Sequence, residues 1–202
     1  MANTPRPPPN ARINLDKLNV LLVDDNQQSL DILSQVLSGF GVRSMHKCDS
    51  GEEALKLVQR MSFDFIMTDG SMPGMDGYEL TQAIRRLQGQ PNAYVPILLV
   101  TGHARQSQVF KARDCGANFV VAKPITPRVL LDRIFWVAKE DRMFVETDTY
   151  VGPDRRFKRE GPPAGVTGRR KDDLTTELGT ATTPNLSQDQ IDGLVKPMKV
   201  NI

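Results

Sequence analysis

The stretch LNVLLVDDN at residues 18–26 decides the fold class of this 202-residue chain. Residues 18–23 form a nearly continuous apolar run, which is typical of a strand buried on both faces of a parallel sheet. The run ILLV at residues 97–100 has the same character. Because helices cover both faces of such a sheet, the two runs predict an α/β fold.

Apolar runs alternate with segments of helical periodicity from about residue 15 to residue 141. Strands are predicted at 18–23, 42–45, 63–67, 97–100 and 119–122. Helices are predicted between Asn26 and Gly39, and at 52–59, 78–87, 105–113 and 127–137. Ser50 and Glu53 form an expected capping box for the second helix, and Thr126 is expected to cap the last one. The alternation predicts a doubly wound, five-stranded parallel sheet.

The regular pattern predicts one domain at 15–142, flanked by segments of different composition. Residues 1–14 contain four prolines, and we expect a disordered arm there. Residues 143–202 contain only 13 Leu, Ile, Val or Phe among 60 residues, so we expect a mostly disordered tail. Within the tail, Ser187 followed by Gln190 predicts a short capped helix at 188–196, which is either a docking peptide or without function.

Composition excludes several classes of protein. The net charge of +2 excludes a strongly basic nucleic-acid binder, and no apolar run is long enough to span a bilayer. The first residues lack the apolar core of a signal peptide. Cys48 and Cys115 have no CxxC spacing, so we expect two reduced thiols in a cytoplasmic protein. The tail lacks the long periodic helices of a DNA-binding output domain.

Polar side chains follow four of the five predicted strands. Asp24 and Asp25 come after the first strand, Asp69 ends the third, Thr101 follows the fourth and Lys123 follows the fifth. Each alone has an ordinary explanation as a helix cap, a turn or a loop residue. Because the carboxyl ends of parallel strands meet at one edge of the sheet, together they predict a single site.

The combination of three carboxylates, a threonine and a lysine indicates capture of a phosphoryl group. Clustered carboxylates repel one another unless a hard cation such as Mg2+ bridges them, and the backbone carbonyl of Ser71 is a further candidate ligand. Asp69 is then the nucleophile that forms an aspartyl phosphate. Lys123 and Thr101 are expected to bind phosphoryl oxygens by charge and by hydrogen bonding.

Over residues 16–141 the sequence resembles the receiver domain of two-component response regulators, the CheY-like fold. The resemblance lies in VLLVDDN at 20–26, Asp69, MPGMDG at 72–77, Thr101, Gly116-Ala117 and Lys123-Pro124. It implies that Asp69 is the phosphoacceptor, that Asp25 is the main metal ligand and that Asp24 supports the metal through water. It also implies a phosphohistidine donor, which is a sensor histidine kinase or a histidine phosphotransfer protein.

One position departs from the family pattern. The residue three before the lysine is usually Tyr or Phe, whereas this chain has Val120 there and Phe119 one place earlier. Neighbouring residues of a strand face opposite sides of the sheet, so Phe119 cannot take the same place. The usual aromatic response to phosphorylation is therefore in doubt.

The tail carries an arginine-rich segment at 150–173. It includes Arg155, Arg156, Arg159, Arg169 and Arg170. A solvated, charge-rich linker is one interpretation. Guanidinium groups also pair with phosphates and guanine edges, and the segment resembles arginine-rich extensions of CheY-like proteins that bind cyclic di-GMP and act on flagellar motors. RNA and acidic proteins are further alternative partners.

Two functions remain open at this point. The first is a cytoplasmic response regulator that accepts a phosphoryl group on Asp69 with Mg2+ and signals to a downstream protein target, without DNA binding, membrane insertion or enzymatic turnover of a substrate. The alternative is a cyclic di-GMP-responsive adaptor that acts on motility or kinase components through the arginine-rich segment. A metal-dependent phosphatase is disfavoured, because Ser71 occupies the position of the required general acid.

Overall fold

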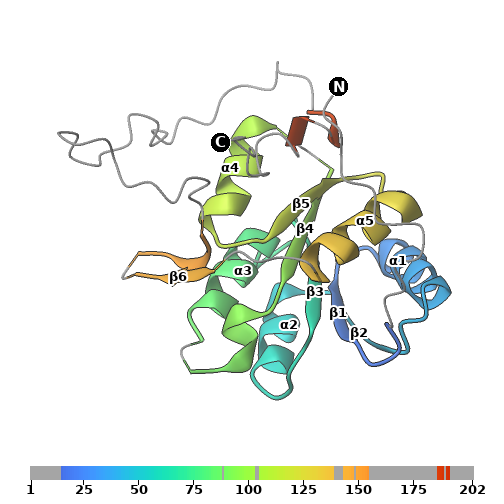
Figure 1. The fold of residues 1–202 in the computed structure, drawn as a ribbon, viewed down its shortest axis with the longest axis horizontal. Coiled ribbons are helices and arrows are strands. Elements are labelled where there is room, and N and C mark those ends of the chain that lie inside the picture. The colour runs from blue at the N-terminus through green and yellow to red at the C-terminus, as the bar shows by residue number, and fades with distance from the viewer. Residues whose placement is uncertain are drawn as a thin grey trace, which may run out of the picture.

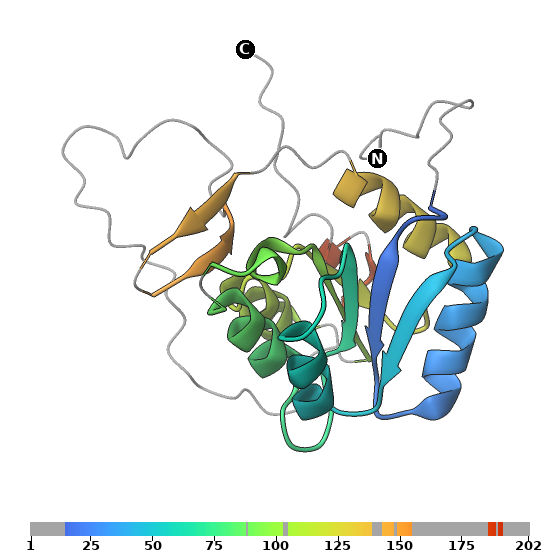
Figure 2. The same cartoon turned by 90° about the horizontal axis from the view of Figure 1, so that it is seen from below.

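A five-stranded parallel sheet forms the centre of the protein in a computed structural model that describes residues 15–87, 89–102, 105–138, 143–147, 149–154, 186–188 and 190–191. The strands are β1 (Asn19–Val23), β2 (Ser44–Cys48), β3 (Phe65–Asp69), β4 (Ile97–Thr101) and β5 (Phe119–Ala122), in the spatial order β2-β1-β3-β4-β5. The helices are α1 (Gln27–Gly39), α2 (Gly51–Val58), α3 (Gly77–Arg85), α4 (Gln106–Asp114) and α5 (Pro127–Ala138), with the 3-10 helix η1 (Pro91–Tyr94) before β4. Helices α1 and α5 cover one face and α2, α3 and α4 the other (Figures 1 and 2), so the predicted doubly wound sheet is confirmed.

The central strands are mainly apolar because both of their faces are covered. In β1, Val20 and Leu22 pack with α1 and α5 on one side of the sheet. Leu21 and Val23 alternate with them and pack with α2 and α3 on the other side. This alternation explains why all four residues 20–23 are apolar.

Two strand predictions were displaced, and the hydrogen bonds of the chain give the reason. The second and third strands begin at Ser44 and Phe65, two residues later than predicted. Val42 is buried, but its N–H closes the end of α1 by donating to the Leu37 carbonyl. Phe63 is also buried, and its N–H donates to the Asn92 side chain at 2.9 Å. Both apolar residues thus fill the core from loops.

Helix caps follow the sequence at some ends and not at others. Asn26 accepts a hydrogen bond from the Ser29 N–H, and Thr126 accepts one from the Val129 N–H, as predicted. The expected capping box at Ser50 was wrong, because the Ser50 side chain makes no capping hydrogen bond. The first turn of α2 is instead tied to a distant loop, where Glu52 Oε1 accepts the Met75 N–H at 2.9 Å.

A β-hairpin lies in the part of the chain where the sequence indicated a mostly disordered tail. Strands β6 (Phe144–Glu146) and β7 (Val151–Pro153) pair antiparallel beside α3 and α4 (Figures 1 and 2). Tyr150 is buried, and its hydroxyl donates to the Pro153 carbonyl at 2.7 Å. Strands of three residues give too short a pattern for sequence periodicity to reveal. The described part of the tail therefore belongs to the folded domain.

The hairpin is attached to the domain around one buried arginine. Arg85 on α3 is only 2% exposed and donates to the carbonyls of Ala93, Val95 and Gly116 and to the Asn118 side chain, at 2.7–2.9 Å. Its guanidinium lies 5.0 Å from the centre of the Phe144 ring. Burial lowers the pKa of Arg85 to about 10, which leaves the group charged at neutral pH. The arginine thus joins α3, η1, the loop before β5 and the hairpin.

Residues 186–188 and 190–191, here called the C-terminal turn, lie near α4 and β5 (Figure 1). Helical conformation is described at residues 188, 190 and 191. The Ser187 N–H donates to Gln190 Oε1 and the Gln190 N–H donates to Ser187 Oγ, so this end has the expected capping box. The remainder of the helix predicted at 188–196, the arm at 1–14 and Arg155, Arg156, Arg159, Arg169 and Arg170 lie outside the described residues.

Among the described helices, none combines the length and the apolar character that a bilayer crossing requires.

Candidate functional site

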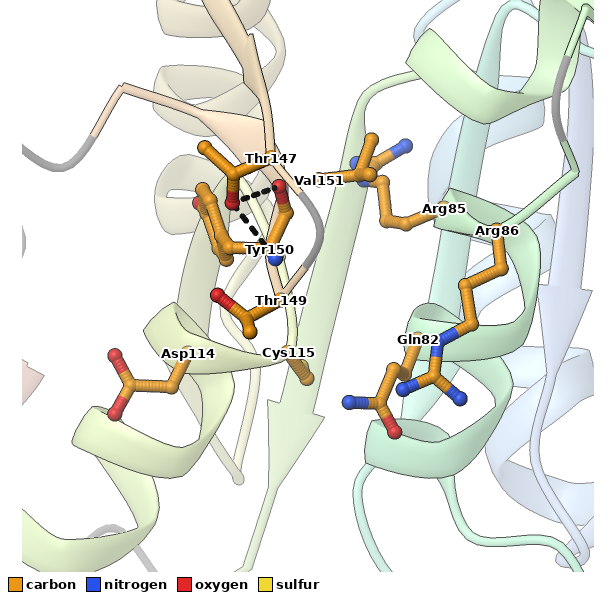
Figure 3. A pocket seen from close by; sticks show the side chains of 9 residues that line it. All are labelled: Gln82, Arg85, Arg86, Asp114, Cys115, Thr147, Thr149, Tyr150 and Val151. Atoms are coloured by element: carbon orange, nitrogen blue, oxygen red, sulfur yellow. Dashed lines mark hydrogen bonds between the residues drawn. The ribbon is translucent and has the colours of Figure 1, made fainter.

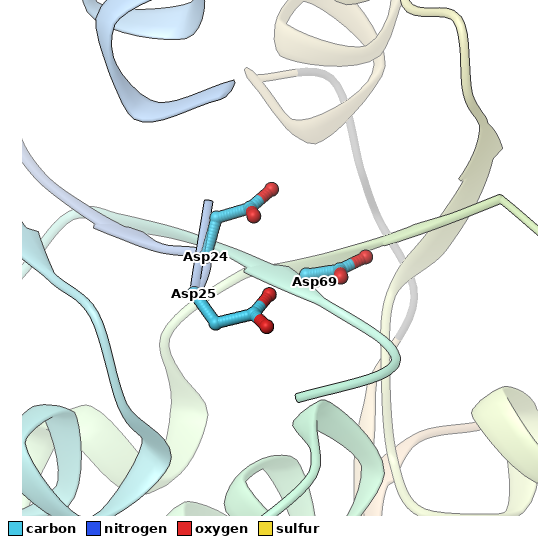
Figure 4. A group of neighbouring side chains, drawn as sticks. All are labelled: Asp24, Asp25 and Asp69. Carbon is cyan, nitrogen blue, oxygen red and sulfur yellow. The ribbon is translucent and has the colours of Figure 1, made fainter. Parts of the chain in front are cut away.

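Three carboxylates meet at the carboxyl edge of the sheet (Figure 4). Asp24 and Asp25 directly follow β1, and Asp69 is the last residue of β3. The two strands are neighbours, with Val23 opposite Thr68, so their ends deliver the acidic residues side by side. One carboxylate oxygen from each aspartate lies within 4.8 Å of the others. The arrangement matches the cluster that the sequence predicted.

The three aspartates differ in their exposure to solvent. Asp24 is 1% exposed and Asp69 is 7% exposed, whereas Asp25 is open to solvent. Asp24 Oδ1 accepts the Asn26 N–H at 2.9 Å, and Asp69 Oδ1 accepts the Gly70 N–H at 3.0 Å. Backbone N–H groups therefore hold the carboxylates of Asp24 and Asp69 in place, and the carboxylate of Asp25 faces solvent.

Lys123 lies between the two buried carboxylates. Its Nζ atom is 2.8 Å from Asp24 Oδ2 and 3.2 Å from Asp69 Oδ1. The backbone of the lysine is positioned by β4, since its N–H donates to the Thr101 carbonyl at 2.8 Å. Thr101, at the end of β4, is itself buried. The structure thus brings together Asp24, Asp25, Asp69, Thr101 and Lys123 from the ends of four strands.

The charges of the site perturb one another. Burial raises the pKa of the Asp69 carboxyl, and Asp24 adds to the rise, while Lys123 opposes it. Burial alone would lower the pKa of Lys123, but its hydrogen bond and attraction to Asp24, together with Asp69, raise it. One ammonium group thus faces three carboxylates. The excess of negative charge on closely spaced oxygens fits a divalent cation of the Mg2+ type, which prefers such ligands.

The predicted fourth ligand, the Ser71 carbonyl, lies on the loop that directly follows Asp69 and β3. Ser71 is exposed and follows Gly70, whose N–H donates to the Val100 carbonyl at 2.7 Å. The loop therefore leaves the sheet directly at the acidic cluster. The role of Ser71 remains a prediction from the sequence.

Two glycines make room around the site. A Cβ atom at Gly77 would overlap the carbonyl oxygen of Asp69, so the start of α3 approaches β3 as closely as only glycine allows. A Cβ atom built at Gly102, beside Thr101, would have no neighbour within 4 Å. The start of α3 is therefore packed tightly against Asp69, whereas the space at Gly102 beside the threonine is open.

An aromatic residue that the sequence analysis did not single out lies next to Thr101. Tyr78, near the start of α3, is buried, and its hydroxyl is hydrogen-bonded to the Thr101 side chain. Burial raises the pKa of Tyr78 to about 12, so the hydroxyl keeps its proton. The ammonium of Lys111 lies 4.3 Å from the centre of the ring. In the sequence, Tyr78 could be noticed only as an aromatic residue that follows Asp76, the N-cap of α3, and Gly77.

The two residues at the atypical position of β5 face opposite sides, as predicted. Val120 packs with Tyr78 and Leu99, whereas Phe119 lies on the other face, with its ring 5.8 Å from that of Trp136. The aromatic ring beside Thr101 therefore comes from α3 and not from β5.

A small pocket lies between α3, α4 and the hairpin (Figure 3). It is lined by Gln82, Arg85, Arg86, Asp114, Cys115, Thr147, Thr149, Tyr150 and Val151. The pocket shares no residue with the acidic cluster. The groups suited to capture a phosphoryl group lie at the acidic cluster.

Comparisons with known proteins agree with this geometry. Residues 20–135 match the family described as response regulator receiver domain. The chemotaxis protein CheY of Pseudomonas aeruginosa is 34% identical over 117 residues, which cover 58% of this chain and 93% of that protein. The structure of the chemotaxis response regulator CheY4 of Vibrio cholerae has a TM-score of 0.55 at 32% identity, covering 59% of this chain and 98% of the other.

Receiver domains of histidine kinases are also similar. That of CKI1 from Arabidopsis thaliana, complexed with Mg2+ and BeF3−, has a TM-score of 0.54 at 31% identity, covering 62% of this chain and 93% of that one. That of a sensor histidine kinase from Pseudomonas aeruginosa, with a magnesium ion in its active-site cleft, has a TM-score of 0.54 at 29% identity, covering 60% and 98%.

The sheet and the acidic edge define the class of the chain as a CheY-like α/β signalling domain. The family match extends over more than half of its length, and the chain belongs to the response regulator receiver domain family of two-component systems.

Proposed function

We propose that the chain receives a phosphoryl group on Asp69 and signals by contact with another protein. The observation that carries this proposal is the placement of Lys123 Nζ, 3.2 Å from Asp69 Oδ1 and 2.8 Å from Asp24 Oδ2, beside a third carboxylate. A cation fixed at the reacting carboxylate is positioned for the charge that develops on a transferred phosphoryl group.

The reaction follows from the groups at the site. An Asp69 oxygen forms a bond to phosphorus, the phosphorus–nitrogen bond of the donor phosphohistidine breaks, and the ring nitrogen leaves with the electron pair. Lys123 offsets charge on one phosphoryl oxygen, and Thr101 donates a hydrogen bond to another. Asp24, Asp25 and Asp69, with the Ser71 carbonyl, would hold Mg2+, which would supply positive charge to offset a dianionic phosphoryl group beside the carboxylates.

The donor and the output are part of the same proposal. Similarity to receiver domains of histidine kinases supports a sensor histidine kinase or a histidine phosphotransfer protein as the donor. We propose a folded unit of residues 15–154, which includes the hairpin, and an output through protein contact without DNA binding.

The test uses a small phosphodonor. With radiolabelled acetyl phosphate and Mg2+, the wild-type chain is expected to take up acid-labile label, and Asp69→Asn is expected to take up none. Asp114→Asn, which alters an exposed aspartate at the end of α4, is the matched control and should label like the wild type. Label that persists in Asp69→Asn would show that another residue is the nucleophile. Chelation of Mg2+ should abolish labelling in the wild type and in Asp114→Asn.

A further inference from the structure

The C-terminal turn occupies a specific place on the domain. Ile191 is 0% exposed and packs in one cluster with Val109 of α4 and with Leu99 and Val120 of the sheet. Leu186 packs against the same cluster. A residue more than 60 positions beyond β5 in the sequence therefore completes the apolar core on this side of the sheet.

Gln188 fixes the turn to the edge of the sheet. Strand β5 is the last strand of the sheet, so one side of its backbone has no neighbouring strand. The Ala122 N–H donates to Gln188 Oε1 at 2.9 Å, and Gln188 Nε2 donates to the Val120 carbonyl at 3.2 Å. The glutamine amide therefore pairs with the exposed strand edge as an adjacent strand would. Apolar burial and paired hydrogen bonds at one place are the features of a ligand bound in a site.

The turn carries its own local structure. The reciprocal hydrogen bonds between Ser187 and Gln190 cap the turn without help from the rest of the domain. Gln188 and Ile191 are three positions apart, so both project on one side of a helical turn. A short segment of another protein with the same pattern can present the same two contacts.

We propose that the C-terminal turn is an intramolecular ligand of the surface formed by α4 and β5. A protein partner of this surface must displace the turn. The partner does so with a segment of the same pattern, which is a capped helical turn with glutamine at its first position and an aliphatic residue three positions later. The surface borders the acidic site. Val120 lies three residues before Lys123 on the same segment. Tyr78, which packs in the same cluster as Val120, is hydrogen-bonded to Thr101. The inference goes beyond the proposed function and does not depend on phosphorylation.

Competition between attached and free segments sets the expected effect. A covalently attached segment acts at an effective concentration on the order of 1 mM. With a free-peptide Kd of about 100 μM, the attached turn would weaken binding of the free peptide about tenfold. Removal of the attached turn from its site should restore the lost affinity.

The experiment measures binding of a fluorescent peptide with the sequence of residues 184–198 to full-length chains. The Ile191→Asp chain is expected to bind the peptide about tenfold more tightly than the wild type, because aspartate cannot enter the apolar cluster. Ile32→Asp is the matched control, since Ile32 on α1 is 53% exposed and should leave the wild-type affinity unchanged. Equal affinity for all three chains, or no binding to an Ile191→Asp chain that retains its circular dichroism, would overturn the proposal.

A second measurement reads the docked state directly. The Ala122 amide should exchange with solvent at least several-fold faster in Gln188→Ala than in the wild type, while amides of β4 stay unchanged. Unchanged protection of Ala122 would show that the glutamine does not cover the strand edge. A dimeric mass in solution that is lost in Ile191→Asp would show instead that the turn of a second copy fills the site, and would overturn the intramolecular assignment.

Discussion

Arg85 offers the most direct test of how this domain is held together. We consider Arg85→Met, which keeps an unbranched apolar stem and removes the guanidinium with its charge and donors. In the wild type, a side chain that is 2% exposed donates four hydrogen bonds, three of them to backbone carbonyls of Ala93, Val95 and Gly116. Methionine would leave these carbonyls without their donor in a place that water does not reach freely.

Two opposing effects determine the magnitude. Four hydrogen bonds from a charged donor contribute about 1.5–2 kcal/mol each, or about 6–8 kcal/mol in total. Burial of the charge costs part of this, and the lowered pKa of about 10, against 12.5 for a free group, corresponds to a cost of about 3 kcal/mol. The stabilisation by the hydrogen bonds exceeds the cost of burying the charge, so we expect Arg85→Met to lower the free energy of unfolding by about 3–5 kcal/mol.

Urea unfolding followed by circular dichroism measures this change. With a slope of about 2 kcal/mol per molar urea, the midpoint should fall by about 2 M. Arg86→Met is the matched control, because Arg86 is the next residue of the chain and is exposed, and its substitution should change stability by less than about 0.5 kcal/mol. A loss of less than about 1 kcal/mol in Arg85→Met would refute the reasoning, because burial of the charge would then cancel its hydrogen bonds.

Three further predictions concern a buried glycine, the two cysteines and the arginine-rich segment. Gly77→Ala places a Cβ atom on the Asp69 carbonyl and should lower the free energy of unfolding by more than about 2 kcal/mol, as thermal or urea unfolding can show. Gly39→Ala, where the new Cβ atom has no neighbour within 4 Å, should be neutral or stabilising. Equal effects would contradict the close approach of α3 to β3. Burial raises the pKa of both cysteine thiols to about 12, so iodoacetamide at pH 8 should modify the native protein far more slowly than the urea-unfolded protein, as mass spectrometry can show; rapid modification of the native state would contradict that burial. The alternative function, a cyclic di-GMP-responsive adaptor, predicts micromolar binding of cyclic di-GMP in a calorimetric titration and its loss in Arg155→Ala/Arg159→Ala; no binding to the wild type would leave the arginine-rich segment without this role.

The acidic site shows what kind of information a sequence of this class contains. Asp24, Asp69, Thr101 and Lys123 were predicted to meet because each ends or directly follows a strand, and parallel strands end at one edge. This inference needs only the order of strands and helices, which apolar periodicity reveals. The departure at Val120 was predicted for the same reason, since the two faces of a strand alternate.

Other features were hidden because their partners are distant in the sequence. Arg85 lies between Ile84 and Arg86 in what reads as the end of an ordinary surface helix, yet its acceptors are up to 33 residues away. Glu52 belongs to a segment that reads as a locally capped helix, but its side chain bonds the Met75 backbone 23 residues later. Local patterns describe local hydrogen bonds, so they assigned the cap to Ser50 and missed both of these contacts.

The C-terminal turn combines features that are local in the sequence with contacts that are distant in it. The sequence by itself determined the doubly wound sheet, the acidic cluster and the capped start at Ser187, because each follows from residue spacing within an element or from the ends of strands. The packing of the hairpin on Arg85 and the pairing of Gln188 with Ala122, 66 residues away, could be seen only in the folded chain. The sequence does not reveal these contacts because the edge of a strand and the ring of acceptors around a buried charge are assembled only when the chain folds.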